Sequence, residues 1–142
     1  MNKKIEVEIT DIAYGGSGIG RVDGLVYFIP NTIPGEYVAA EVVKLKKKYA
    51  LALLVEVLQS STRRITPVCP LAVPGSCPGC SYQHIEYEEE LRIKKQQLKN
   101  FLERGLKKDL SSVLKESLAA PLPLYYRNKI VLHAGLNKKQ LR

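Results

Sequence analysis

Hydrophobic and polar residues alternate along the first part of the chain in the pattern of short β-strands. In residues 4–11, Ile5, Val7 and Ile9 alternate with polar neighbours, which predicts a strand with one buried face. The Asp-Gly pair at 23–24 predicts a tight hairpin turn. Further strands are predicted before this turn and over residues 25–29, 37–44 and 51–58. Five short strands in about 60 residues indicate a small closed β-barrel.

Glycines punctuate residues 14–21, where Gly16, Gly18 and Gly20 alternate with other residues. The spacing is reminiscent of a phosphate-binding loop, but no helical pattern follows and no Gly-Lys-Ser/Thr sequence is present. We therefore exclude a nucleotide site here. We expect these glycines to serve tight turns and bulges of the barrel.

A change of pattern at residue 85 predicts one long helix over residues 85–105. The segment 85–104 contains no Pro or Gly, and Leu91, Leu98 and Leu102 recur at helical spacing. Acidic residues gather at its start and basic residues follow, as the helix dipole favours, so the acidic run has a structural explanation. The spacing also predicts two ion pairs, Glu88–Arg92 and Glu90–Lys94.

The net charge of +8, from 22 basic and 14 acidic residues among 142, favours an anionic partner, and we expect nucleic acid. Up to Ser60 the basic and acidic residues balance, so the excess lies after it. The balanced half nevertheless contains a local cluster beside Tyr49, which could hold phosphates while the ring stacks on a base. The alternative is a solvated hairpin tip. This lysine cluster consists of Lys44, Lys46, Lys47 and Lys48.

Three cysteines, Cys69, Cys77 and Cys80, lie in a proline-rich segment. Three cysteines are too few for a disulfide scaffold, and an odd number cannot all pair within the chain. Their close spacing instead indicates a metal site in a protein of a reducing compartment. Zinc bound by these thiolates and His84 is one possibility, and an iron-sulfur cluster with a fourth ligand from elsewhere is another. Three reduced cysteines without metal form the third possibility.

A family resemblance accompanies the predicted barrel. The run from Tyr14 to Gly24, followed by Val26–Pro30 and then by Pro34-Gly35-Glu36, resembles the TRAM domain, a small RNA-binding β-barrel of the oligonucleotide-binding type. The similarity covers residues 1–58. It implies that this barrel binds RNA.

A second resemblance covers the cysteine segment, residues 59–84. Cys69-x7-Cys77-Pro78-Gly79-Cys80 followed by Gln83-His84 resembles the iron-sulfur segment of the RNA uracil-5-methyltransferase family, in which a TRAM domain often precedes it. Two departures are a longer first gap and Pro78 in place of glycine. The resemblance implies a 4Fe-4S cluster bound by the three cysteines and by a fourth ligand outside this chain. His84 is then no ligand.

Beyond the helix, Pro121 and Pro123 interrupt the chain, and residues 124–132 read as a strand. The sequence Tyr-Arg-Asn-Lys at 126–129 resembles the opening of the central domain of the same methyltransferases. The resemblance implies RNA contacts for this stretch, and a plain surface strand is the alternative. The residues concerned are Arg127, Asn128 and Lys129.

The sequence thus predicts a mainly β protein with one long helix. Its parts are a five-stranded barrel over 1–58, a cysteine loop over 59–84, a helix over 85–105, and the incomplete start of a mixed central RNA-binding domain over 106–142. No cysteine nucleophile, general base or cofactor fold for methyl transfer is visible. We expect an inactive N-terminal fragment or a truncated gene product.

The resemblance implies the N-terminal part of an S-adenosylmethionine-dependent RNA uracil-5-methyltransferase acting on 23S ribosomal RNA or on transfer RNA, with S-adenosylmethionine bound only in a full-length protein. The alternative is a stand-alone, non-catalytic RNA-binding protein with a zinc knuckle. The residues before Glu8 do not form a secretory signal, and the apolar run at 49–55 is too short to span a membrane. We therefore expect a soluble cytoplasmic protein without an obligate protein partner.

Overall fold

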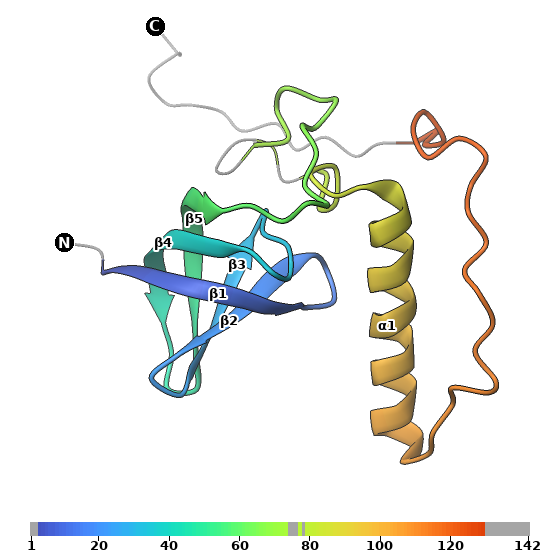
Figure 1. Ribbon diagram of the computed structural model, residues 1–142, viewed down its shortest axis with the longest axis horizontal. Coiled ribbons are helices and arrows are strands. Elements are labelled where there is room, and N and C mark those ends of the chain that lie inside the picture. Colours follow the sequence, from blue (N-terminus) through green and yellow to red (C-terminus); the bar gives the residue numbers. More distant parts are fainter. Residues whose placement is uncertain (1–2, 74–76, 78, 130–142) are drawn as a thin grey trace, which may run out of the picture.

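The computed structural model describes residues 3–73, 77 and 79–129 and shows a five-stranded barrel followed by one long helix (Figure 1). The predicted fold class is confirmed. The barrel closes in the strand order β1-β2-β3-β5-β4. The elements are β1 (Lys4–Ile12), β2 (Ser17–Val22), β3 (Leu25–Pro30), β4 (Tyr37–Leu45), β5 (Tyr49–Gln59) and α1 (Tyr87–Leu106).

Antiparallel pairing joins all neighbouring strands except β3 and β5, which are parallel and complete the barrel. The predicted alternation of β1 is confirmed, because Ile5, Val7 and Ile9 point into the core. They pack there with Tyr27 and Ile29 of β3 and with small or branched residues of β4 and β5. The period-2 pattern therefore fixes which face of each strand is buried.

The predicted hairpin between β2 and β3 is confirmed. Asp23 and Gly24 both have positive φ angles, of 50° and 76°. Two consecutive residues in that region form the turn whose twist matches that of the flanking strands, and Asp-Gly is a preferred pair for it.

The prediction that the alternating glycines serve turns and bulges is wrong for Gly18, whereas Gly20 pairs with Ile9 at an irregularity in the pairing of β1 with β2. Both lie within β2, are buried, and have no positive φ. A Cβ on Gly18 would lie 2.0 Å from Thr32 Oγ1, and one on Gly20 would lie 2.4 Å from Val7 Cγ2. These positions are glycine because β1 and the β3–β4 loop leave no room for a side chain inside the narrow barrel.

A second, smaller core joins the barrel to α1. Ile12 and Ile33 from the barrel end meet Ile85 and Ile93, the last of which is the buried residue of α1. The Nε2 of Gln97 on the same helix donates a hydrogen bond to the Ala13 carbonyl at 2.9 Å. The helix therefore docks on one end of the barrel through apolar packing and the Gln97 hydrogen bond.

The helix begins and ends within two residues of its predicted bounds. Gly105, the expected stop, lies inside α1, and Lys107 instead takes the left-handed position, its N–H bonded to the Glu103 carbonyl at 2.8 Å. The predicted pair Glu90–Lys94 forms. The predicted pair Glu88–Arg92 is wrong, because Arg92 pairs instead with Glu89, at a spacing of three residues rather than four.

The predicted strand over 124–132 is wrong for residues 124–129, which have no strand partner, and its remaining residues lie outside the described part. The segment after α1 instead packs back along the helix. Tyr87 Oη accepts a hydrogen bond from the Ala120 N–H at 2.8 Å, and Lys95 Nζ lies 2.5 Å from Glu116 Oε1. These contacts hold residues 116–120 beside α1, just before the stretch in which the strand was predicted.

The prediction that no segment spans a membrane can be checked on the helix of the structure. The helix α1 carries too many charges along its 20 residues to span a bilayer, and the described residues offer no other candidate helix.

Candidate functional site

The lysine cluster lies at the turn between β4 and β5. The Lys46 N–H donates to the Tyr49 carbonyl at 2.8 Å and closes the hairpin. All four lysines are exposed. Among the described residues, no carboxylate lies within ion-pair distance of them. Their charge is therefore available to an anionic ligand.

An aromatic pair lies beside the cluster on the outer face of the barrel. The rings of Phe28 and Tyr49 meet edge to face, with centroids 5.8 Å apart and planes inclined at 81°. Tyr49 stays 39% exposed. Packing against Phe28 restricts the Tyr49 ring without covering it, so the ring can still stack on a base.

The outer face of β5 continues this surface with aliphatic side chains, a feature that the sequence analysis missed. Leu51, Leu53 and Val55 are 37%, 44% and 53% exposed, whereas Ala50 and Ala52 point into the core. The sequence already indicates which face is outward, because the small residues Ala50 and Ala52 alternate with the larger leucines. A narrow barrel accepts the small residues inside and leaves the large ones outside.

The cysteine segment follows β5 and, among the described residues, contains neither helix nor strand apart from one isolated bridge between Arg64 and Ile85. All three cysteines are free thiols. Cys69 is half-buried, and Cys77 and Cys80 are exposed. Thiolates are the ligands that zinc and iron-sulfur clusters use in proteins, so the chemistry of these three side chains suits such a metal site.

One amide connects two of these cysteines. Gln83 Oε1 accepts a hydrogen bond from the Cys69 N–H at 3.2 Å, and Gln83 Nε2 donates to Cys80 Sγ at 3.2 Å. Within the described ranges, no three His, Cys, Asp or Glu side chains converge on one metal position. The cysteine ligand set therefore stays a prediction.

His84, the fourth ligand of the zinc alternative, is buried beneath the barrel end. Its Nε2 lies 3.4 Å from the carbonyl oxygen of Thr32, and only 3% of the residue is exposed. Burial, followed by the nearby Arg64 charge, lowers the pKa of His84 below its ordinary value of 6.5. The surroundings favour a neutral imidazole that packs against the β3–β4 loop.

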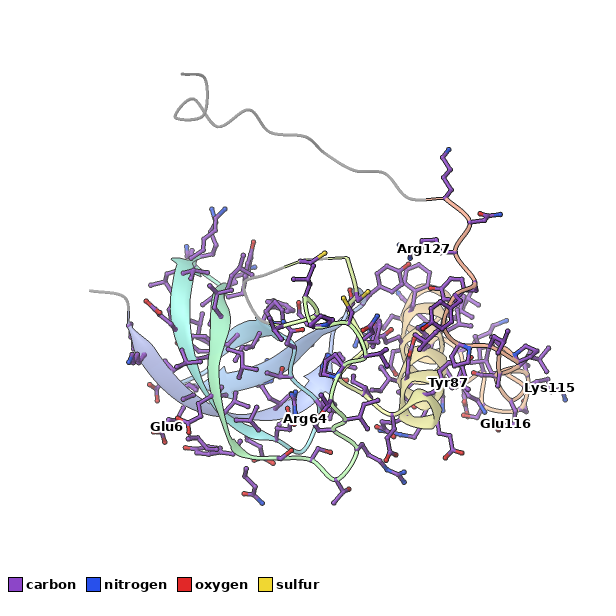
Figure 2. All side chains as sticks on the ribbon, turned by 90° about the horizontal axis from the view of Figure 1, so that it is seen from above. Glu6, Arg64, Tyr87, Lys115, Glu116 and Arg127 are labelled. Carbon is purple, nitrogen blue, oxygen red and sulfur yellow. The ribbon has the colours of Figure 1, made fainter. Side chains whose placement is uncertain are left out.

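A buried ion pair, also missed by the sequence analysis, fixes the start of the cysteine segment. Glu36 is fully buried, and its carboxylate accepts bonds from Arg64 Nε at 2.6 Å and Arg64 Nη2 at 2.7 Å. The Ile33 N–H donates to the same carboxylate at 2.9 Å. Figure 2 shows Arg64 where the barrel meets the segment that leads to α1.

The β1–β2 loop abuts the other end of the cysteine segment. A Cβ on Gly16, which has a φ of 93°, would lie 2.8 Å from the Cβ of Ser81. The barrel therefore contacts the segment immediately after Cys80. The close approach and the Arg64 anchor together hold both ends of the cysteine segment against the same end of the barrel.

The structure does not bring the candidate residues together. The β4–β5 turn lies at one end of the barrel, and the cysteine segment leaves β5 at the other (Figure 1). Arg127, Asn128 and Lys129 are exposed, and Figure 2 places Arg127 beside α1. The candidate RNA contacts at the β4–β5 turn and the candidate metal ligands therefore lie at opposite ends of the barrel.

The comparison with protein families decides the nature of the barrel. The family model described as "TRAM domain" matches residues 2–55, which comprise the first four strands and most of β5. Residues 2–55 form a TRAM domain. The last strand of the barrel ends at Gln59, four residues beyond the last matched position.

Curated relatives extend the similarity over nearly the whole chain. A Listeria monocytogenes protein described as an uncharacterized RNA methyltransferase is 40% identical over 134 residues, and a Clostridium acetobutylicum protein with the same description is 36% identical over 135 residues. Each match covers 94% of this chain and 29% of the relative. This chain thus spans less than a third of the length of these relatives.

Two solved structures also match. One is a conserved protein of Methanococcus maripaludis, 42% identical, with a TM-score of 0.36 over 38% of this chain and 77% of that one. The other is the Pyrococcus abyssi tRNA (uracil-54, C5)-methyltransferase, 25% identical, with a TM-score of 0.46 over 68% of this chain and 21% of that one.

Proposed function

We propose that this chain is the RNA-binding and cluster-bearing N-terminal region of an S-adenosylmethionine-dependent RNA uracil-5-methyltransferase of the cytoplasm. The TRAM domain and the relatives described as RNA methyltransferases support this proposal. In a full-length enzyme the methyl transfer belongs to a domain that this chain does not contain. The 142-residue chain alone is expected to bind RNA without methylating it.

The observation that carries the RNA-binding proposal is the lysine cluster beside Tyr49. Four exposed lysines lie next to a half-exposed ring that Phe28 holds in place. Lysines attract the phosphate backbone, and an aromatic ring stacks on bases of any sequence. This combination suits a single-stranded or unpaired stretch of RNA better than a regular duplex, whose bases are already stacked.

The test is charge reversal within the cluster. The triple variant Lys46→Glu, Lys47→Glu and Lys48→Glu should bind RNA more weakly. Each lost phosphate contact should also make the dependence of log affinity on log salt shallower by about 0.7 for a single strand. The measurement is fluorescence anisotropy with a labelled RNA at several salt concentrations.

The matched control reverses three exposed charges at and after the end of α1, namely Arg104, Lys108 and Lys115. This control changes the net charge by the same amount but leaves the β4–β5 turn intact. Equal losses of affinity in the two triple variants would show that only net charge matters. An unchanged affinity and slope in the Lys46–Lys48 variant would remove the lysine cluster from the proposal.

For the target, we propose 23S ribosomal RNA, with transfer RNA as the competing class. The resemblance of the cysteine segment to the methyltransferase family supports a structured cellular RNA but does not separate the two classes. Competition of unlabelled 23S fragments and of transfer RNA against the labelled strand distinguishes them. Tighter competition by transfer RNA would overturn the ribosomal assignment.

We further propose that Cys69, Cys77 and Cys80 bind a 4Fe-4S cluster, with the fourth ligand outside this chain. When bound, the cluster supplies a redox-active iron-sulfide centre held by thiolates. The three free thiols and the Gln83 bridge support this assignment. Iron and acid-labile sulfide in protein purified without oxygen are the expected result, and stoichiometric zinc without sulfide would contradict it.

A further inference from the structure

Gln83 belongs to the motif that carries the family resemblance, but the predicted ligand set assigns it no role. Its side chain contacts two cysteines that are eleven positions apart in the sequence, Cys69 through a backbone N–H and Cys80 through the sulfur. Both contacts measure 3.2 Å. The residue is half-buried, its bond to Cys69 is partly buried, and its bond to Cys80 is exposed.

The chemistry of these contacts fixes the orientation of the amide. A backbone N–H can only donate, so the oxygen of Gln83 must face Cys69. The amide nitrogen is thereby directed at Cys80 Sγ, where its N–H is the donor and the sulfur the acceptor. A flipped amide would place a donor against the Cys69 N–H, which excludes it.

We propose that Gln83 is a positioning residue for the thiolate-bound cluster, donating an N–H···S hydrogen bond to Cys80 and accepting one from the backbone N–H of Cys69. This inference rests on the cluster of the proposed function. A hydrogen bond to a ligand sulfur withdraws electron density, which stabilises the reduced state of a cluster and raises its reduction potential. The link between the two cysteines also orders the loop before a metal binds.

Two substitutions separate these effects. Gln83→Leu removes both hydrogen bonds and keeps much of the side-chain volume. Gln83→Glu keeps an acceptor for the Cys69 N–H and removes the donor to Cys80. The matched control is Gln96→Leu, at an exposed position of α1 where the amide bonds only to Asn100.

The experiment uses the 142-residue chain, reconstituted without oxygen with iron, sulfide and excess dithiothreitol, whose thiolate takes the coordination position of the fourth ligand that lies outside this chain. Two quantities are measured for each protein, namely the midpoint reduction potential and the rate at which an iron chelator removes the metal. Both Gln83 variants should have a more negative potential than wild type. The leucine variant should in addition release iron faster, on the order of 10-fold, as expected for loss of a partner behind metal ligands.

The outcomes separate this inference from the proposed cluster. Wild-type protein that takes up no iron and sulfide would overturn the cluster and, with it, the role of Gln83. A reconstituted wild type whose potential and iron release are matched by both Gln83 variants would overturn the role of Gln83 alone. Circular dichroism and RNA affinity at the distant lysine cluster show that each variant is folded.

Discussion

The Glu36 carboxylate and the Arg64 guanidinium form a bidentate ion pair at the junction of the barrel and the cysteine segment. Nε lies 2.6 Å from Oε1 and Nη2 lies 2.7 Å from Oε2. Arg64 Nη2 also donates to the Asn31 carbonyl at 2.8 Å. Because Glu36 is fully buried, its charge depends on these partners. The pair joins the β3–β4 loop to the chain that follows β5.

Removing one member of this pair should be costly. Glu36→Ala leaves the Arg64 charge and the Ile33 N–H without their acceptor, and loss of one partner of a buried pair costs about 2 to 4 kcal/mol when the other side chain is partly exposed. Urea unfolding followed by circular dichroism measures the change. The neighbouring pair Arg63–Glu86 is the control, because both side chains are substantially exposed. Arg63→Ala should cost less than about 1 kcal/mol, and equal costs for the two variants would contradict the role of burial.

Sequence patterns predicted the barrel well because its strands follow local rules. The alternation of β1, the Asp-Gly turn and the glycine-free helical stretch each depend on neighbours within a few positions. The β3–β5 pairing that closes the barrel and the Glu36–Arg64 pair connect residues far apart in the sequence, and no local pattern carries that information. The Pro-Gly-Glu motif marked a turn, but only the fold shows that its glutamate is buried.

The candidate sites were predictable to different degrees. The lysine cluster was located correctly at a hairpin, since four lysines between two strands are a local signal. Its separation from the cysteine segment by the length of the barrel is a tertiary property. The strand predicted at 124–129 is wrong because the local β pattern has no partner strand there among the described residues, and pairing with a partner is a tertiary property.

The tight packing of β2 gives a second prediction. Gly18→Ala and Gly20→Ala place a methyl group within 2.0 Å and 2.4 Å of neighbouring side chains, and such overpacking should cost about 1 to 3 kcal/mol in unfolding free energy. The control is Gly105→Ala in the last turn of α1, where nothing lies within 4 Å of the new Cβ. That variant should gain about 0.5 to 1 kcal/mol, because alanine favours the helix. Thermal melts of the three proteins check both signs, and a neutral Gly18 variant would show that β2 can shift.

A third prediction concerns the attachment of α1. Ile93 is 3% exposed and packs with Ile12, Ile33 and Ile85, so Ile93→Ala should cost about 3 kcal/mol through the cavity it leaves. Because few other contacts hold the helix, hydrogen exchange should speed up along α1 while the barrel amides stay protected. Leu98→Ala, at a position that is 49% exposed, should change neither. Equal acceleration in the barrel would mean that helix and barrel unfold as one unit.

The fourth prediction follows from the lowered pKa of His84. Because burial and Arg64 disfavour the protonated imidazole in the folded protein, the unfolded chain binds the proton more readily, and stability must fall as pH decreases. The loss begins as pH falls through the ordinary value of 6.5 and levels off below the lowered folded-state pKa. His84→Gln keeps a donor for the Thr32 carbonyl without titrating, so its unfolding free energy should change less between about pH 7.5 and 5.5. Urea midpoints across that range measure the difference, with His133→Gln as the comparison for the loss of one histidine. A His84→Gln protein as pH-sensitive as wild type would show that other groups set the acid response.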